Sequence, residues 1–278
     1  MKLEKLTEQE CIDAIKNEKH FHALVANGAF EIKVEKYSYY VCAAIHDGHQ
    51  LRPEIINNCN LNEDERLYEE DPYTGELISS MPVTMIARDS RYEYDLNRGP
   101  DSCVYDEAWG KPVWAIPLTE EEKSLSLHKH QSFYRVLGAL LEKIVTRYGS
   151  CLVYDMHSYN FKRLDKDTPA FNIGTEQLDK GKWSEIINHW VRELDSLSVP
   201  GINLRYAAYE VFYGRGYLAT FVAANFDNVL ALPTEVKKVF MDELTGQADN
   251  KILPGLKKVF EQSLLNTAQY YASQHIQK

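Results

Sequence analysis

The run Tyr39-Tyr40-Val41-Cys42-Ala43-Ala44-Ile45 is apolar and strand-like, and it leads into the turn His46-Asp47-Gly48-His49. Such a run is typical of a strand buried on both faces of a sheet. A second short apolar run at 151–155 leads to another histidine, His157. We therefore predict that two buried strands end side by side and that their histidines meet around a metal ion.

The patterns along the rest of the chain alternate between strand and helix. The longest helix expected has a capping box at Thr119 and Glu122, an apolar stripe at helical spacing, and Gly149 as its left-handed cap. Strand, long helix and strand follow each other as a parallel α/β sheet requires. Helices are expected at 7–18, 120–148, 183–197 and 254–270, and strands at 30–34, 37–45, 82–87, 92–96 (paired with 82–87), 151–155, 204–212 and 229–234.

Length and composition fit a folded enzyme-sized globule. The chain has 278 residues, 44% hydrophobic and 26% charged, and a formal net charge of −10. That charge argues against nucleic acid or an anionic membrane as a partner, because both favour a basic surface. A small anionic substrate stays possible, since a few local arginines can outweigh the global charge.

The five cysteines show no close pairing of the kind that binds metal, which is consistent with reduced thiols. No apolar run approaches the ~18 residues of a membrane span, and the first residues carry no apolar signal region. We expect a cytoplasmic protein, and the sequence does not predict an oligomeric state.

Three histidines and an aspartate are the core of the predicted metal site. His46 and His49 could place two imidazoles on one cation, although a pair this close is more often surface or hydrogen-bonded. His157 strengthens the metal interpretation. Asp155 lies two residues before it, so it shares a strand face with His157 and could orient its ring through the second nitrogen. The alternative is a capping aspartate beside an ordinary loop histidine.

A carboxylate must complete the site. The acidic stretch 62–72 would by itself be a solvated helix surface, but it offers Glu69, Glu70 and Asp71, of which Asp71 precedes Pro72 and is best held in a turn. The candidate general base is Glu235, which follows the apolar run 229–233. Its alternative interpretation is a first-turn glutamate of a helix at 236–244.

Five arginines occupy loops rather than clear helix faces, and arginine binds carboxylates bidentately. Such a set suits an anionic substrate, although each arginine alone could be a surface ion-pair residue. The five are Arg88, Arg91, Arg98, Arg163 and Arg215.

These motifs together resemble the N-formylglutamate amidohydrolase family over roughly residues 38–245. The resemblance rests on six segments, listed here in chain order: His46-x-Gly48 after its strand, Ala87-Arg88-Asp89-Ser90-Arg91-Tyr92-Glu93-Tyr94-Asp95-Leu96-Asn97-Arg98, Asp155-Met156-His157-Ser158, Phe171-Asn172-Ile173-Gly174-Thr175, Gly214-Arg215-Gly216-Tyr217 and Leu232-Pro233-Thr234-Glu235. It implies one hydrolase domain over 1–278, with a three-layer α/β/α fold and a mixed, mostly parallel sheet similar to zinc carboxypeptidases. The N-terminal and C-terminal helices flank the family-like core.

The resemblance also implies roles for individual residues. His46, His157 and an acidic residue, Asp71 or Glu70, would bind Zn²⁺ or another divalent metal, and Glu235 would act as general acid and base. Substrate binding would fall to Arg91, Asn97, Arg98, Arg215 and Tyr217. His49 stands where zinc carboxypeptidases carry glutamate, and could be a ligand, an indirect support or a proton donor. Phe133-Tyr134-Arg135 stands where many members have Pro-Tyr-His.

The expected function is therefore metal-dependent hydrolysis of the N-acyl amide of an acidic amino acid, with N-formyl-L-glutamate, a compound of histidine catabolism, as the favoured substrate. The alternatives are a carboxypeptidase-like peptidase or cell-wall-fragment amidase, and a non-catalytic binding protein on the same fold.

Overall fold

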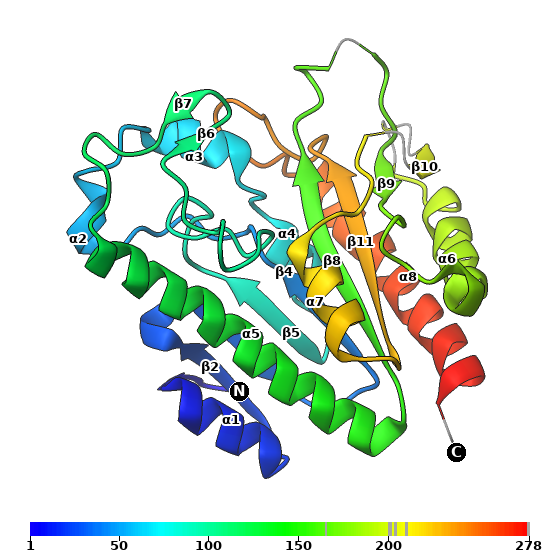
Figure 1. The fold of residues 1–278 in the computed structure, drawn as a ribbon. Helices are drawn as coiled ribbons and strands as arrows, with labels where there is room; N and C mark the ends of the chain where they lie inside the picture. Colours follow the sequence, from blue (N-terminus) through cyan, green and yellow to red (C-terminus); the bar gives the residue numbers. More distant parts are fainter. Residues whose placement is uncertain (165, 200–201, 203–204, 209–210, 277–278) are drawn as a thin grey trace.

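A nine-stranded mixed sheet forms the centre of the computed structural model, which describes residues 1–278 except 165, 200–201, 203–204, 209–210 and 277–278 (Figure 1). The strand order is β1-β2-β3-β5-β4-β8-β11-β9-β10, and the pairs at its centre, β5–β4, β4–β8 and β8–β11, are parallel. Antiparallel pairs join β2 to β3, β3 to β5 and β9 to β11. The sheet is therefore mixed and mostly parallel, as predicted.

The strands of this sheet are β1 (Leu3–Leu6), β2 (Phe21–Val25), β3 (Phe30–Val34), β4 (Tyr40–Ala44), β5 (Val83–Ala87), β8 (Cys151–Tyr159), β9 (Phe171–Ile173), β10 (Tyr206–Ala208) and β11 (Val229–Lys237). A separate hairpin joins β6 (Glu107–Ala108) to β7 (Lys111–Pro112). The helices are α1 (Glu8–Lys16), the 3₁₀ turn η1 (Ala26–Gly28), α2 (Pro53–Ile56), α3 (Glu63–Glu69), α4 (Thr74–Ile78), α5 (Glu120–Tyr148), α6 (Lys180–Asp195), α7 (Tyr217–Asn225) and α8 (Ile252–His275).

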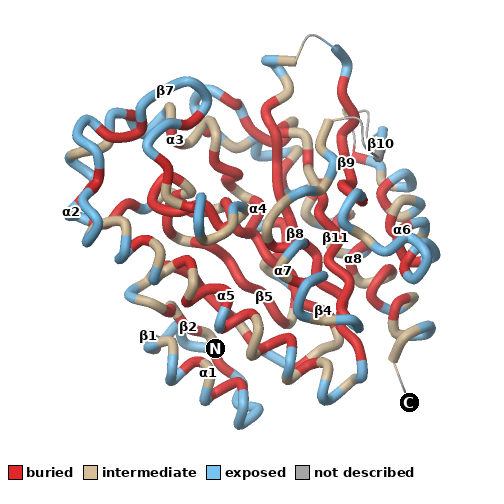
Figure 2. Tube along the Cα trace, viewed as in Figure 1, coloured by how far each residue is buried: buried red, intermediate tan, exposed pale blue. Residues whose placement is uncertain are grey.

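Helices cover both faces of the sheet, because side chains alternate between the faces along each strand. On one face, Val41, Val153 and Ala231 pack in a core with α1, α5 and α7. On the other, Cys42 and Leu152 pack in a second core with α4, α6 and α8. The three-layer α/β/α architecture is thus confirmed, and Figure 2 shows the central strands buried along their length.

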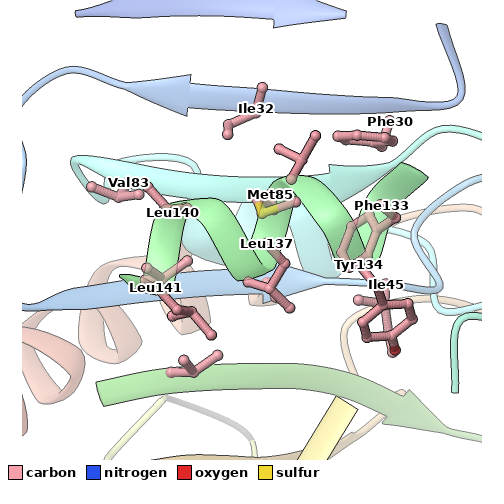
Figure 3. Close-up of a cluster of buried hydrophobic side chains, with 14 of the residues drawn as sticks. Phe30, Ile32, Ile45, Val83, Met85, Phe133, Tyr134, Leu137, Leu140 and Leu141 are labelled. Atoms are coloured by element: carbon pink, nitrogen blue, oxygen red, sulfur yellow. The ribbon is translucent and has the colours of Figure 1, made fainter. Parts of the chain in front are cut away.

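The helix α5 supplies much of the first core. Its capping box at Thr119 and its Gly149 cap (φ 80°) match the prediction. Leu137, Leu140 and Leu141 lie beside side chains of the strands in the close-up of this cluster (Figure 3). This packing fixes α5 against the strands of the sheet.

Two of the expected elements are wrong. Residues 92–96 form turns instead of a strand, and β5 pairs with β3 and β4. The apolar–polar alternation there suggested a half-exposed strand, yet all five residues are buried. No helix follows Glu235, because β11 continues to Lys237 and the described chain then turns. Glu235 is therefore a strand residue.

Other boundaries moved without a change of element. β8 extends four residues beyond the expected end, to Tyr159, so that His157 lies inside it. Within the expected strand 204–212, Tyr206–Ala208 is β10, while 204, 209 and 210 lie outside the described residues. β1 and β2 had not been predicted. None of the helices in the described part of the chain combines the length and apolar character needed to cross a bilayer.

Candidate metal centre

The carboxyl ends of β4, β8 and β11 bring the predicted site residues together. Cα pairing places Glu235 of β11 beside His157 of β8, and Pro233 beside Asp155. Asp155, His157 and Glu235 follow the strand positions that face α5 and α7. His46 comes just after β4, whose Ala43 is paired with Asp155. Three neighbouring strands therefore present polar side chains at one edge, where open α/β sheets bind ligands.

His46, Asp71 and His157 form a buried cluster in which one ligand atom from each lies within 4.8 Å of the other two. Oδ2 of Asp71 is 3.3 Å from Nδ1 of His46 and 3.3 Å from Nδ1 of His157. All three residues are at most 3% exposed. Two imidazole nitrogens and one carboxylate oxygen around a common point are the donor set of a catalytic zinc site.

Asp71, rather than Glu70, faces the histidines. The backbone of Asp71 is tied to the neighbouring loop, with its N–H donating to His46 O at 2.8 Å. The carboxylate of Glu70 points elsewhere and accepts hydrogen bonds from His49 Nδ1 (2.5 Å) and from the Ser90 hydroxyl. The geometry thus places Asp71, and not Glu70, against His46 and His157.

Each histidine has a carboxylate on its outer nitrogen. Nε2 of His157 lies 3.0 Å from Asp155 Oδ1, as the strand register suggested. Nε2 of His46 lies 2.7 Å from Oδ1 of Asp95, a fully buried residue. The hydrogen bond of His46 Nε2 to Asp95 keeps the proton on that nitrogen and leaves Nδ1 free to bind a cation, while Asp155 acts on His157 as an ion-pair partner. Asp95 had no assigned role in the sequence analysis, although it lies within the segment 90–98 that carries the family resemblance.

The electrostatics of the cluster fit a cation. Burial works against the charge of Asp71, but hydrogen bonds from His157 and His46 hold its pKa well below the usual range. Burial also opposes protonation of His157, yet the charge of Asp155 raises its pKa well above the usual value. Buried carboxylates thus draw positive charge into this site, which is the condition for holding a divalent metal.

Glu235 lines a pocket beside the cluster. Burial raises its pKa to about 8, although the positive charge of His157 opposes this. The pocket has a volume of about 320 Å³ and also exposes Asn97, Asp155, His157 and Arg215. A carboxyl group whose pKa lies near neutrality is suited to take up and release a proton.

His49 lies apart from the cluster. Its side chain is 37% exposed and is paired with Glu70, and it is absent from the group of ligand atoms around Asp71. The structure therefore places His49 outside the cluster, in a hydrogen bond with the buried Glu70.

The predicted substrate-binding residues of the segment 91–98 divide into two groups. The Arg91 guanidinium is turned inward, donating to Glu69 O (3.0 Å) and to Asp95 Oδ2 (2.8 Å). Arg98 is exposed and lies over the Tyr105 ring at 4.4 Å. Asn97 lines the pocket, and its buried Oδ1 has no hydrogen-bond partner in the described structure. Asn97 is thus open to a ligand and Arg91 is engaged within the protein, while the exposed Arg98 is paired with Asp95, with Nε 3.6 Å from Oδ2.

The loop before α7 forms the opposite wall of the pocket. Gly174 and Gly214 are in backbone contact there, since a Cβ on Gly174 would lie 2.2 Å from Gly214 Cα. The Arg215 side chain is 66% exposed and paired with Glu176 at 3.0 Å. Tyr217 packs against the rings of His130 and Tyr134, so it supports the wall rather than lining the pocket.

Three further residues lie outside the pocket lining: Arg88, Arg163, and Tyr134 of the Phe133-Tyr134-Arg135 motif. Arg88 pairs with Glu31, and Arg163 pairs with Glu69 at 2.6 Å. The Tyr134 hydroxyl donates to the carbonyl of Leu96. This helix residue therefore holds the segment that carries Asn97.

The comparisons with known proteins agree with this arrangement. Residues 38–238 match the protein-family model described as N-formylglutamate amidohydrolase. Among solved structures, an N-formylglutamate amidohydrolase from Ralstonia eutropha is 18% identical, with a TM-score of 0.71, over 87% of this chain and 97% of the other. A gene product from Agrobacterium tumefaciens is 16% identical, with a TM-score of 0.63, over 86% and 94%. These two similarities show a shared fold. No curated protein sequence matches the chain.

Proposed function

Because the chain belongs to the N-formylglutamate amidohydrolase family, and so to a family of hydrolases, we propose that it is a zinc-dependent amidohydrolase acting on the N-acyl amide of an acidic amino acid. The proposed substrate is N-formyl-L-glutamate, and the products are L-glutamate and formate. The observation that carries this proposal is the His46–Asp71–His157 cluster with Glu235 as its neighbour in strand register.

His46 and His157, through their Nδ1 atoms, and Asp71 are the residues that would hold the metal. When bound, a divalent cation supplies Lewis acidity toward the amide carbonyl and toward water. Asp95 and Asp155 keep the two imidazole rings in the orientation that this requires.

Glu235 is the residue proposed to move the proton. It accepts a proton from the water that attacks the formyl carbon and then delivers it to the leaving amine nitrogen. Burial raises the pKa of Glu235 to about 8, so its ionised carboxylate is a stronger base than an exposed glutamate, and the protonated form can return the proton to the amine. The burial that raises this pKa is set by its place in β11.

Arg98 and Arg215 are proposed to bind the substrate carboxylates, because both side chains are exposed. Asn97 offers its buried, unpartnered Oδ1 as an acceptor for the amide N–H of the substrate. Arg91 acts indirectly, through its hydrogen bond to Asp95.

The proposal is tested with His157→Ala and the exposed His128→Ala as control. We expect His157→Ala to fold, to lose bound zinc and to release no L-glutamate from N-formyl-L-glutamate, while His128→Ala behaves as wild type. Full activity in His157→Ala or in chelator-stripped wild-type protein would refute the proposal.

A substrate panel separates the remaining alternatives. A carboxypeptidase-like peptidase or cell-wall-fragment amidase would prefer peptides with a free carboxylate over N-formyl amino acids. A binding protein without catalysis would turn over no member of the panel.

A further inference from the structure

Lys238 is a buried lysine directly after β11, three residues beyond Glu235, and it is 1% exposed. Lysine is almost never fully buried unless its ammonium group is paired. Its Nζ donates hydrogen bonds to two backbone carbonyls, that of Tyr68 at 2.9 Å and that of Glu70 at 2.6 Å. The side chain thus crosses from the sheet to the segment that leads into Asp71.

Those carbonyls belong to the C-terminal end of α3, whose cap residue is Glu70. The last carbonyls of a helix have no partner within the helix, and cations are favoured there by the helix dipole. Asn160 also donates to the Tyr68 carbonyl, and Arg91 donates to the Glu69 carbonyl at 3.0 Å. Three consecutive carbonyls are therefore held by side chains from distant parts of the chain.

This clamp acts on the residue that faces both histidines. Asp71 follows Glu70 directly, so a shift of the Glu70 carbonyl moves the Asp71 backbone. The Asp71 backbone is also held on its own account, because its N–H donates to His46 O at 2.8 Å and its carbonyl accepts from the Thr74 hydroxyl at 2.7 Å. Lys238 therefore links the backbone next to Asp71 to the segment that directly follows β11, the strand of Glu235.

We infer that Lys238 is a positioning residue for the metal centre, holding Asp71 where it can share a cation with His46 and His157. The inference rests on the proposed metal-dependent function. Lys238 touches neither substrate nor metal in this scheme, and its effect passes through the backbone of Glu70 and Asp71.

The test uses Lys238→Met, which keeps an unbranched side chain and removes the donors. Lys237→Met is the matched control, because Lys237 also donates to a backbone carbonyl, Thr168 O at 3.1 Å, in a different segment. Zn²⁺ affinity is measured by competition with a chromophoric chelator, and the visible spectrum of the Co²⁺-loaded protein reports ligand geometry. We expect Lys238→Met to bind Zn²⁺ about 10- to 100-fold more weakly and to change the Co²⁺ spectrum.

If Lys238→Met has the same Zn²⁺ affinity and Co²⁺ spectrum as Lys237→Met, the inference is overturned. Any effect of Lys238→Met would then be a general packing defect that leaves the metal ligands in place. If Lys238→Met does not fold, Lys238→Gln and Lys237→Gln replace the pair under the same criterion. Wild-type protein that binds no Zn²⁺ would refute the proposed function and this inference together. Tight binding without amide hydrolysis would refute the proposed function alone.

Discussion

Asp95→Asn is the substitution that tests the site most sharply, because it keeps the shape of a fully buried side chain and removes its charge. Oδ1 of Asp95 accepts hydrogen bonds from His46 Nε2 (2.7 Å) and from Asn97 N–H (2.8 Å). Oδ2 accepts one from Arg91 at 2.8 Å. An amide has one oxygen and one NH₂ group, so it cannot satisfy both sides.

Each orientation of the new amide has a defined cost. With NH₂ toward Arg91, two donors face each other and a charge-assisted hydrogen bond worth about 1.5–3 kcal/mol is lost. With NH₂ toward His46, the proton of that imidazole must move to Nδ1, the atom that faces Asp71, and the ring can no longer bind a metal. We therefore expect Zn²⁺ affinity to fall about 10- to 100-fold, or about 1.4–2.7 kcal/mol.

The assay is Zn²⁺ competition with a chromophoric chelator, together with kcat/KM for N-formyl-L-glutamate at saturating metal. The exposed Asp101→Asn serves as control for the loss of one negative charge in the same region. Zn²⁺ affinity of Asp95→Asn within threefold of that control would refute the argument that Asp95 sets the tautomer of His46.

Four further predictions concern catalysis, stability and specificity. Glu235→Gln should lower kcat by about 10²–10⁴-fold. The raised pKa of Glu235 penalises its ionisation in the fold, so metal-free wild type should lose stability as pH rises from the pKa of Glu235 in the unfolded chain toward 8. Urea unfolding should therefore find Glu235→Gln more stable than wild type at pH 8 and as stable as wild type near pH 4. Equal stability of the two proteins at both pH values would contradict this. Gly48→Ala places a Cβ 2.2 Å from Asp89 O and should cost about 3 kcal/mol. Gly138 lies inside α5, where a Cβ would make only an ordinary 3.7 Å contact with Phe221 of α7, so Gly138→Ala should gain about 0.5–1 kcal/mol; the same sign for both would be inconsistent with the packing. Arg215→Ala should raise KM for N-formyl-L-glutamate about tenfold and leave kcat little changed, and unaltered discrimination against N-formyl-L-glutamine would remove Arg215 from carboxylate binding.

The sequence alone identified the elements whose signals are local. The capping box and glycine cap of α5 lie within one helix, and the buried run before His46 needs only its own apolar residues. Asp155 and His157 share a strand face by simple alternation, and the structure brings them to 3.0 Å. Patterns of this kind depend only on residues close in sequence, so they can be recognised without the tertiary structure.

The segment 92–96 shows where alternation misleads. Tyr92, Tyr94 and Leu96 suggested one buried face of a strand, with the acidic residues between them in solvent. In the fold, Glu93 accepts hydrogen bonds from Arg52 and Lys129, and Asp95 accepts them from His46 and Arg91. Both sets are buried because cations from distant segments meet the carboxylates.

Only the tertiary structure decided how the metal centre is completed. Glu70 and Asp71 are adjacent carboxylates with equal chemistry, and the path of the backbone between α3 and α4 turns Asp71 toward the histidines of the cluster and Glu70 toward His49. Asp95 and Lys238 joined the site through contacts across 49 and 168 residues of sequence. Sequence patterns alone identified the imidazoles and the candidate base. The fold decided their partners, because packing between segments far apart in the chain fixes which carboxylate reaches which nitrogen.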